Sequence, residues 1–349
     1  MVARSVSPPH RSGHPAIAAR SPTDATDPAR LAPEAVVWTG PARAELAGEL
    51  LDVMGSAIRP IGVGGPRSAE VDALGKRLDC PAGDDLRKLR IDRPAAYLLL
   101  TTMRDVPAEE LRAFAEAGTR VLSLEPFAAT LGELGGDRGP AKAATAGAWS
   151  FVPAFVDSPG FRAAADPQDS LGGPRLVRCS SLGRPTHGSL LARLVDAWAA
   201  VLRFVDLPET IDASLTGPAE APRRIAGRIA AHARVADGSA VVLEAADTAG
   251  ASRRELSVLG TDAHLHIDDA GYELRHPDGH MLDHAPATAM PFVDLLADQW
   301  RQRLERPNAG TPAEPVRQAH ALACVHACLL SAKTGQPERP DTQLALRRS

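Results

Sequence analysis

The sequence predicts an α/β fold, with a doubly wound parallel sheet in the N-terminal part of the chain followed by a second domain of the α+β class. Two observations predict it. Between residues 34 and 124, short apolar and β-branched runs alternate with segments in which apolar residues recur at helical spacing. After residue 147, the apolar runs become shorter and turn-like segments join them. Strands that alternate with helices favour parallel pairing through right-handed crossovers.

The N-terminal domain is predicted over residues 34–147. Gly40 and the pair Gly64–Gly65 each follow a predicted strand and precede a predicted helix, as expected of strand–turn–helix units. Pro107 stands at the start of a helix, where its fixed φ is favourable. Strands are expected at 35–39, 58–63, 95–101 and 120–124, and helices at 43–54, 68–78, 84–89 and 107–117.

The second domain is predicted over residues 148–340. Its long last helix is expected to end at Gly335, because glycine readily takes the left-handed conformation that closes a helix. Residues 1–33, rich in Ser, Pro, Arg and Ala, are expected to be a disordered tail, and residues 341–349 a second tail. Strands are expected at 175–179, 228–234, 239–243, 255–259 and 264–267, and helices at 190–204, 292–304 and 313–333.

Composition excludes several classes of protein. The 349 residues carry a net charge of -4 at pH 7, so neither nucleic acid nor an anionic membrane surface is an expected partner. No apolar stretch approaches the roughly 20 residues that a membrane-spanning helix needs. Because the sequence shows no secretory signal, its four cysteines do not indicate a disulfide framework. We expect a cytoplasmic protein that binds a small molecule and has no membrane or nucleic-acid partner.

Several segments occur in an order that is typical of one enzyme family. The first, residues 84–134, contains the sequence VLSLEPFAATLGEL, in which Glu125 and Pro126 follow a predicted strand. The segments after it are 172–198 with GSLLARLVDAW, 227–247, 255–269 with LGTDAH, and 320–340 with LLSAKTG. In this order the chain resembles, over residues 34–340, the Gfo/Idh/MocA family of NAD(P)-dependent oxidoreductases.

The resemblance implies a Rossmann-type first domain and a C-terminal α+β domain with a large, mostly antiparallel sheet. It also implies an ancestor that transferred hydride between NAD(P) and a CH–OH group of a carbohydrate or polyol. Family members commonly assemble through the sheet of the second domain. A homo-oligomer or a hetero-oligomer through that sheet is therefore expected.

The loop after the first predicted strand departs from the family's phosphate-binding loop. A dinucleotide loop uses small residues so that the backbone can approach the pyrophosphate. Of these only Gly40 is kept: Pro41 lacks an N–H donor, and Ala42 adds a Cβ where the pyrophosphate passes. Arg43 is either a contact to phosphate or a solvated residue at the start of a helix. Weak binding of a dinucleotide, or none, is expected.

The end of the second predicted strand completes the expected cofactor site. Relatives that use NAD carry an acidic residue there, whereas this chain has the sequence GGPRS over residues 64–68. Arg67 and Ser68 suit a 2′-phosphate, so any dinucleotide held here is expected to be NADP rather than NAD; the alternative is an ordinary turn between strand and helix. By resemblance, Thr101, Glu125 and Pro126 also belong to the cofactor site.

The residues expected to carry the chemistry are changed as well. Where the family has a catalytic lysine before proline, this chain has Glu125, which reverses the charge and cannot donate a proton while ionised. On the helix that follows Gly188, the family's Asp and His positions are taken by Ala192 and Asp196. His187 is either a displaced base or an exposed residue at the helix cap. Glu125 and Asp196 together would form a two-carboxylate site suited to a cation, an amine or sugar hydroxyls.

No metal site is predicted, because the histidines do not match a known zinc signature. Those expected on a surface hairpin are His264, His266, His276, His280 and His284. The residues His320, Cys324 and Cys328 recur every fourth position of the last helix and are expected to pack in the core.

These departures leave three functions open. The first is a catalytically impaired homologue that binds a sugar-like ligand, a cofactor or a protein partner. The second is an active NADP-dependent oxidoreductase that acts on a carbohydrate or polyol through a non-standard acid–base site. The third is a structural partner of an active homologue.

Overall fold

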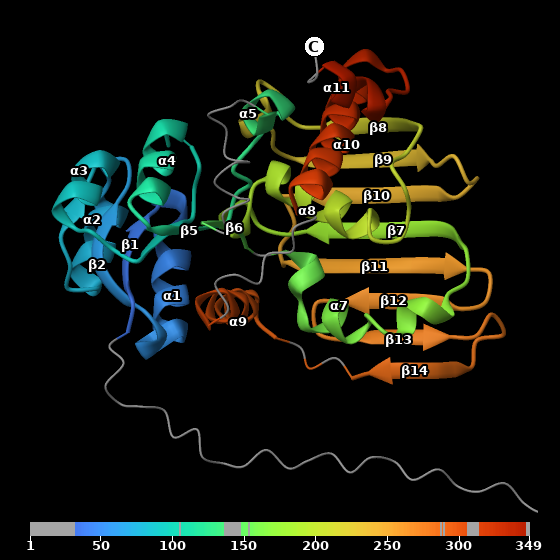
Figure 1. Cartoon of the computed structure of the whole chain (residues 1–349), viewed down its shortest axis with the longest axis horizontal. Coiled ribbons are helices and arrows are strands. Elements are labelled where there is room, and N and C mark those ends of the chain that lie inside the picture. The colour runs from blue at the N-terminus through green and yellow to red at the C-terminus, as the bar shows by residue number, and fades with distance from the viewer. Residues whose placement is uncertain are drawn as a thin grey trace, which may run out of the picture. The chain divides into compact units, whose positions relative to one another are not determined.

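The computed structural model describes residues 32–346 except for 105, 136–147, 153, 287, 289 and 306–313 (Figure 1). These residues belong to one compact unit that begins at Ala32. The predicted N-terminal tail lies outside the described residues except for Ala32 and Pro33. None of the described helices is both long and apolar enough to span a membrane.

A six-stranded sheet forms the core of the N-terminal domain, with the strand order β3-β2-β1-β4-β5-β6 and parallel neighbours. The order reverses between β1 and β4, so the topological switch point lies at the carboxyl ends of these two strands. The predicted Rossmann-type, doubly wound sheet is confirmed. The strands are β1 (Glu34–Trp38), β2 (Arg59–Gly64), β3 (Ala82–Gly83), β4 (Tyr97–Leu100), β5 (Arg120–Ser123) and β6 (Trp149–Phe151).

Helices cover both faces of this sheet. Along β1, Val37 packs with apolar residues of α1 and α2, while Val36 packs with those of α3 and α4, because successive side chains of a strand point to opposite faces. Ser68 begins α2 as an N-cap: its Oγ accepts a hydrogen bond of 3.2 Å from the N–H of Val71. The helices are α1 (Ala44–Met54), α2 (Ala69–Arg77), α3 (Leu86–Asp92), α4 (Ala108–Glu116) and the short α5 (Leu131–Gly135).

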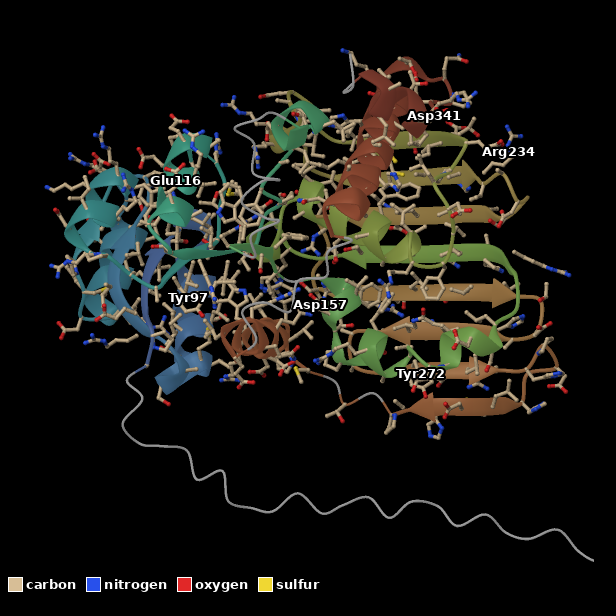
Figure 2. The ribbon with its side chains drawn as sticks, in the orientation of Figure 1. Tyr97, Glu116, Asp157, Arg234, Tyr272 and Asp341 are labelled. Carbon is tan, nitrogen blue, oxygen red and sulfur yellow. The ribbon has the colours of Figure 1, made fainter. Side chains whose placement is uncertain are left out.

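Two segments from the predicted second domain join the first. β6 pairs with β5 beyond the expected boundary at residue 147. Helix α9 (Phe292–Glu305) packs Trp300 into the core that contains Val37 and α1. Helix α9 also contacts the second domain, because its Arg303 pairs with Asp157, which is labelled in Figure 2. The amphipathic sequence of α9 indicates that one face is buried but not which core buries it.

An eight-stranded sheet forms most of the second domain, in the order β14-β13-β12-β11-β7-β10-β9-β8. β7 and β10 run parallel, and the other neighbouring strands run antiparallel. The predicted large, mostly antiparallel sheet is confirmed. Its strands are β7 (Pro174–Leu182), β8 (Thr210–Thr216), β9 (Arg228–Arg234), β10 (Ala240–Ala246), β11 (Arg253–Gly260), β12 (His264–Asp268), β13 (Tyr272–Arg275) and β14 (Met281–Ala285).

Helices α8 (Leu190–Val201) and α10 (Glu314–Thr334) lie on one face of this sheet, as Figure 1 shows. Trp198 of α8 and the pair Cys324 and Cys328 of α10 are fully buried in the same core, so the core packing expected for the two cysteines is confirmed.

A short helix closes the described chain where we expected a tail. Helix α11 (Pro340–Leu346) lies against α10, and Leu344 packs on the core of the second domain. Proline is favoured in the first turn of a helix, which accounts for its start. The remaining residues of the expected tail, 347–349, lie outside the described part of the chain.

Candidate functional site

At the switch point of the parallel sheet, two buried threonines are hydrogen-bonded to each other across the ends of β1 and β4. Thr39 follows β1 and Thr101 follows β4, and the Oγ1 of Thr101 donates a hydrogen bond of 2.7 Å to the Oγ1 of Thr39. The N–H of Thr101 donates to the C=O of Trp38 at 3.0 Å, which continues the strand pairing past β4. In doubly wound folds, ligands bind in the crevice at this end of the strands.

The loop at the start of α1 is already folded on itself. Pro41–Arg43 forms a turn of 3-10 helix, in which the N–H of Arg43 donates to the C=O of Gly40 at 3.0 Å. The N–H of Ala44 donates to the C=O of Pro41. Free backbone N–H groups at a helix start are what attracts a phosphate. Here two of them have partners within the loop, and Pro41 has no N–H at all.

The Arg43 side chain turns from this loop across the switch point. Its Nη1 donates to the C=O of Thr101 and lies 2.5 Å from Oε1 of Glu125, while its Nη2 donates to the C=O of Pro185 at 3.2 Å. The side chain is only 11% exposed. The Arg43 side chain is therefore not solvated, and its guanidinium does not point back to its own loop, where a phosphate would bind. It joins the ends of β4 and β5 to the second domain.

Glu125 is held on both carboxylate oxygens. Besides Arg43, its Oε1 accepts a hydrogen bond of 3.0 Å from the N–H of Ser189, and its Oε2 accepts one from the hydroxyl of Ser189. Ser189 is the N-cap of α8, and its own Oγ accepts from the N–H of Ala192 at 3.1 Å. A carboxylate at a helix N-terminus is stabilised by the helix dipole. Glu125 thus forms a fully bonded link between β5 and α8.

Asp196 belongs to a different network, so it does not meet Glu125 as a carboxylate pair. Its Oδ1 accepts a hydrogen bond of 2.6 Å from the N–H of Phe155, and its Oδ2 lies 2.9 Å from Nη1 of Arg254. Arg254 also bonds Asp269 through Nε at 2.9 Å. Burial raises the pKa of Asp196, and the charge of Arg254 opposes that rise.

His187 faces a small cavity between the two domains. Its Nδ1 lies 2.8 Å from the Oγ of Ser252, and its ring stacks on Phe292 of α9 with centroids 4.5 Å apart. Burial, followed by the charges of the neighbouring arginines, lowers the pKa of His187. The imidazole is therefore neutral at neutral pH, and it is half-buried rather than exposed at the helix cap.

The cavity beside His187 is small, and Arg193 and Arg254 are among the residues that line it. It has a volume of about 20 Å³, which is about what one water molecule needs. Arg193 lies along its wall and donates to the C=O groups of Leu182 and Arg184 at 3.0 and 3.1 Å. A Cβ on Gly183 would lie 2.2 Å from Nη2 of Arg193, so this glycine makes room for the guanidinium. Burial lowers the pKa of Arg193 to about 10.

Arg193 and Arg254 are not among the site residues predicted from the sequence, although the sequence carries a signal for Arg193. Arg193 and Asp196 interrupt the otherwise apolar helix sequence LLARLVDAW. A charged residue on the buried face of a helix needs a partner. The partner of Asp196 comes from β11, whose position beside α8 is set by the sheet topology and not by the local sequence.

The other expected cofactor residues have structural partners. Arg67 is 87% exposed and pairs with Asp84 at 2.5 Å. Ser68 caps α2. The C=O of Pro126 accepts a hydrogen bond of 3.1 Å from Nη1 of Arg223, in the second domain. The structure thus brings Arg43, Thr101 and Glu125 together, and it leaves Arg67 and Ser68 outside that group.

Comparison with known proteins identifies the fold. No protein-family model matches the sequence. No curated protein matches it either. Solved structures do match: UDP-N-acetylglucosamine 3-dehydrogenase from Acidithiobacillus ferrooxidans has a TM-score of 0.62 at 12% identity, covering 86% of this chain and 98% of that one.

Two further matches have similar values. Levoglucosan dehydrogenase, solved with NADH and L-sorbose, has a TM-score of 0.66 at 13% identity, covering 88% of this chain and 98% of that one. A putative myo-inositol dehydrogenase from Sinorhizobium meliloti 1021 has a TM-score of 0.61 at 14% identity, covering 88% and 99%. The chain therefore has the two-domain fold of these sugar and polyol dehydrogenases, in agreement with the resemblance of its sequence to the Gfo/Idh/MocA family.

Proposed function

We propose that this chain is a divergent dehydrogenase homologue that no longer transfers hydride and that acts by binding. The observation that carries the proposal is the ion pair between Arg43 and Glu125. These two residues stand at the phosphate loop and at the family's lysine position, and they bond to each other across the switch point. The place where a nicotinamide cofactor and its lysine would meet is thus taken by the chain's own side chains.

The energetics of this pair oppose dinucleotide binding. A cofactor entering the switch point has to displace Arg43 and leave Glu125, whose side chain is 8% exposed, without its countercharge. Separating a buried ion pair costs about 3–5 kcal/mol. Each 1.4 kcal/mol is a tenfold loss of affinity, so the pair weakens binding by roughly two to four orders of magnitude.

The residues at the expected catalytic positions are also poorly placed to act as a general acid or base. Glu125 is an acceptor in three contacts, and Asp196 is held by Arg254 and the Phe155 backbone. His187 is the remaining candidate base, and its Nδ1 is engaged with Ser252. Among the residues of this site, an active NADP-dependent oxidoreductase would have to use His187 as its base.

A sugar-sized ligand is disfavoured beside His187, because the cavity there has the volume of about one water molecule. A protein partner is favoured instead. Helices α8 and α10 cover one face of the eight-stranded sheet. The other face carries side chains that are exposed or half-buried, such as Arg178, His232 and Glu244. We propose that this face binds a subunit of the same fold, either a second copy or an active homologue.

A titration tests the proposal directly. NADPH, NADP, NADH and NAD are added to the full chain while the thermal unfolding midpoint and the nicotinamide fluorescence are followed. We expect every dissociation constant to exceed about 1 mM, a value that corresponds to a binding free energy of only about 4 kcal/mol. Submillimolar binding of any of the four would overturn the claim that the switch point is closed. Wild-type turnover on a panel of sugars and polyols would reject the loss of hydride transfer.

A second pair of measurements separates the remaining possibilities. Glu125→Lys with Asp196→His restores the residue types of the family and is assayed with the same panel.

Light scattering after size-exclusion chromatography gives the number of subunits, and Arg178→Glu with His232→Glu is expected to reduce it. A monomer at all concentrations would contradict assembly through the sheet.

The cysteines and the end of β2 bear on the compartment and on the preferred cofactor. All four cysteines are free, and three of them are buried, which supports a reducing compartment such as the cytoplasm. Should a dinucleotide bind, the exposed Arg67 and the absence of a carboxylate at residues 64–68 favour NADP over NAD.

A further inference from the structure

The tip of the β13–β14 hairpin gathers three side chains of types that bind metal ions. The Nδ1 atoms of His276 and His280 lie 3.1 and 2.6 Å from Oδ1 of Asp278. One ligand atom from each of the three residues lies within 4.8 Å of the other two. Zinc with bonds of about 2.0–2.1 Å in a tetrahedral site needs donor atoms roughly 3.4 Å apart. Small side-chain rotations are enough to reach that spacing.

The hairpin holds the two imidazoles on one side. The N–H of His276 donates to the C=O of His280 at 2.9 Å, so the two residues lie opposite each other across the hairpin. Opposite residues of an antiparallel pair project to the same face, and the two rings stack with centroids 4.7 Å apart. Gly279, with φ of 95°, closes the turn between them. The backbone therefore places the two imidazoles opposite each other before a metal binds.

The carboxylate is positioned by the backbone of the same turn. Oδ1 of Asp278 accepts a hydrogen bond of 3.1 Å from the N–H of His280. The same Oδ1 is the atom that both imidazoles face. Each imidazole that now faces it through Nδ1 can carry its proton on Nε2 instead, which leaves Nδ1 free as a ligand.

We propose that His276, Asp278 and His280 form a binding site for a divalent transition-metal ion, with zinc as the ion to test. Two imidazoles and one carboxylate suit zinc and its neighbours, whereas magnesium and calcium prefer oxygen ligands throughout. The side chains are 46%, 61% and 58% exposed, so an ion can enter from solvent and keep water as a fourth ligand. The site shares no residue with the switch point, and it stands whether or not the proposed function holds.

The test is a zinc titration of the full chain without an affinity tag. Binding is measured by isothermal titration calorimetry or by competition with a chromophoric indicator. We expect one equivalent of zinc whose affinity falls about tenfold or more in His276→Ala, and likewise in His280→Ala. His320→Ala, which changes a half-buried histidine of α10 far from the hairpin in sequence and outside the proposed subunit interface, is the matched control and keeps the wild-type affinity.

Nuclear magnetic resonance of the imidazole nitrogens gives an independent readout. Zinc is expected to shift the ring nitrogens of His276 and His280 and not those of His232, and an equal concentration of magnesium is expected to shift neither. Thermal unfolding confirms that the variants fold. Wild-type zinc affinity in the double variant His276→Ala/His280→Ala, or no saturation below about 1 mM zinc, overturns the proposal.

Discussion

The Nη1 of Arg43 lies 2.5 Å from the Oε1 of Glu125, so an ion pair joins the start of the first helix to the end of β5. Taken from the sequence, Glu125 departs from the Gfo/Idh/MocA pattern, and Arg43 is a residue of the altered loop after β1. In the folded chain the two residues depend on each other, because each side chain supplies the countercharge that the other needs in a buried place.

Removal of the Glu125 carboxylate is expected to destabilise the fold strongly. Glu125→Ala leaves Arg43 buried without a countercharge and should lower the free energy of unfolding by about 3–5 kcal/mol, measured by urea denaturation. Asp84→Ala is the control, since it removes an ion pair with Arg67 whose side chains are 44% and 87% exposed. An exposed pair contributes no more than about 1 kcal/mol. Equal losses in the two variants would contradict the role given to the Arg43–Glu125 pair.

The two residues are also expected to be energetically coupled. In Arg43→Ala/Glu125→Ala both charges are gone, so neither is left buried alone. The loss of unfolding free energy in the double variant should be smaller than the sum of the two single losses by about 1–3 kcal/mol. A double-mutant cycle in urea measures this difference, and simple additivity would show that the contact carries no stabilisation.

The two glycines that follow β1 and β2 are expected to respond differently to substitution. A Cβ on Gly65 would lie 1.9 Å from the C=O oxygen of Thr39, a backbone atom that cannot move aside, whereas a Cβ on Gly40 would meet only Thr102 at 3.7 Å. Gly65→Ala should therefore lower the unfolding free energy by about 1–3 kcal/mol or more, and Gly40→Ala should change it by less than about 0.5 kcal/mol. Thermal and urea unfolding compare them. A large loss in Gly40→Ala would mean that the loop needs its glycine after all.

His187 is expected to make stability depend on pH. Its pKa in the folded chain lies below the usual value of 6.5, chiefly because of burial. As the pH falls below about 6.5, the unfolded chain takes up the proton first, so the free energy of unfolding decreases until the pKa of the folded chain is passed. Above about pH 7.5 the imidazole is neutral in both states and the contribution is complete.

Urea unfolding between about pH 5 and pH 8 measures this effect. His187→Gln should reduce the slope of stability against pH below the usual histidine pKa, and His232→Gln on the exposed part of β9 serves as the matched substitution. If the slope is the same in wild type and His187→Gln, burial does not disfavour the protonated imidazole.

The fold is predictable from the sequence because the patterns that indicate its strands and helices are local. The alternation of apolar runs with helical spacing predicts β1, β4 and β5 as strands of a parallel sheet, and the structure confirms the sheet. The run of apolar residues before Glu125 and the proline after it define the register, so the expectation that Glu125 takes the place of the family's lysine needs no coordinates. From its place in the chain, α9 was expected in the second domain. An amphipathic pattern shows that one helix face is buried, but it does not indicate which surface that face packs against.

What the sequence determines by itself is therefore the order of the elements. Through its resemblance to the family it also predicts which positions are changed: a loop with one glycine, and a carboxylate in place of a lysine. Only the tertiary structure decides that Arg43 and Glu125 neutralise each other, that Asp196 belongs with Arg254, and that His276 and His280 face each other. The physical reason is distance along the chain. Arg43 and Glu125 are 82 positions apart by subtraction of their numbers, and contacts of that kind depend on how the sheet orders its strands, a property that no local pattern of residues encodes.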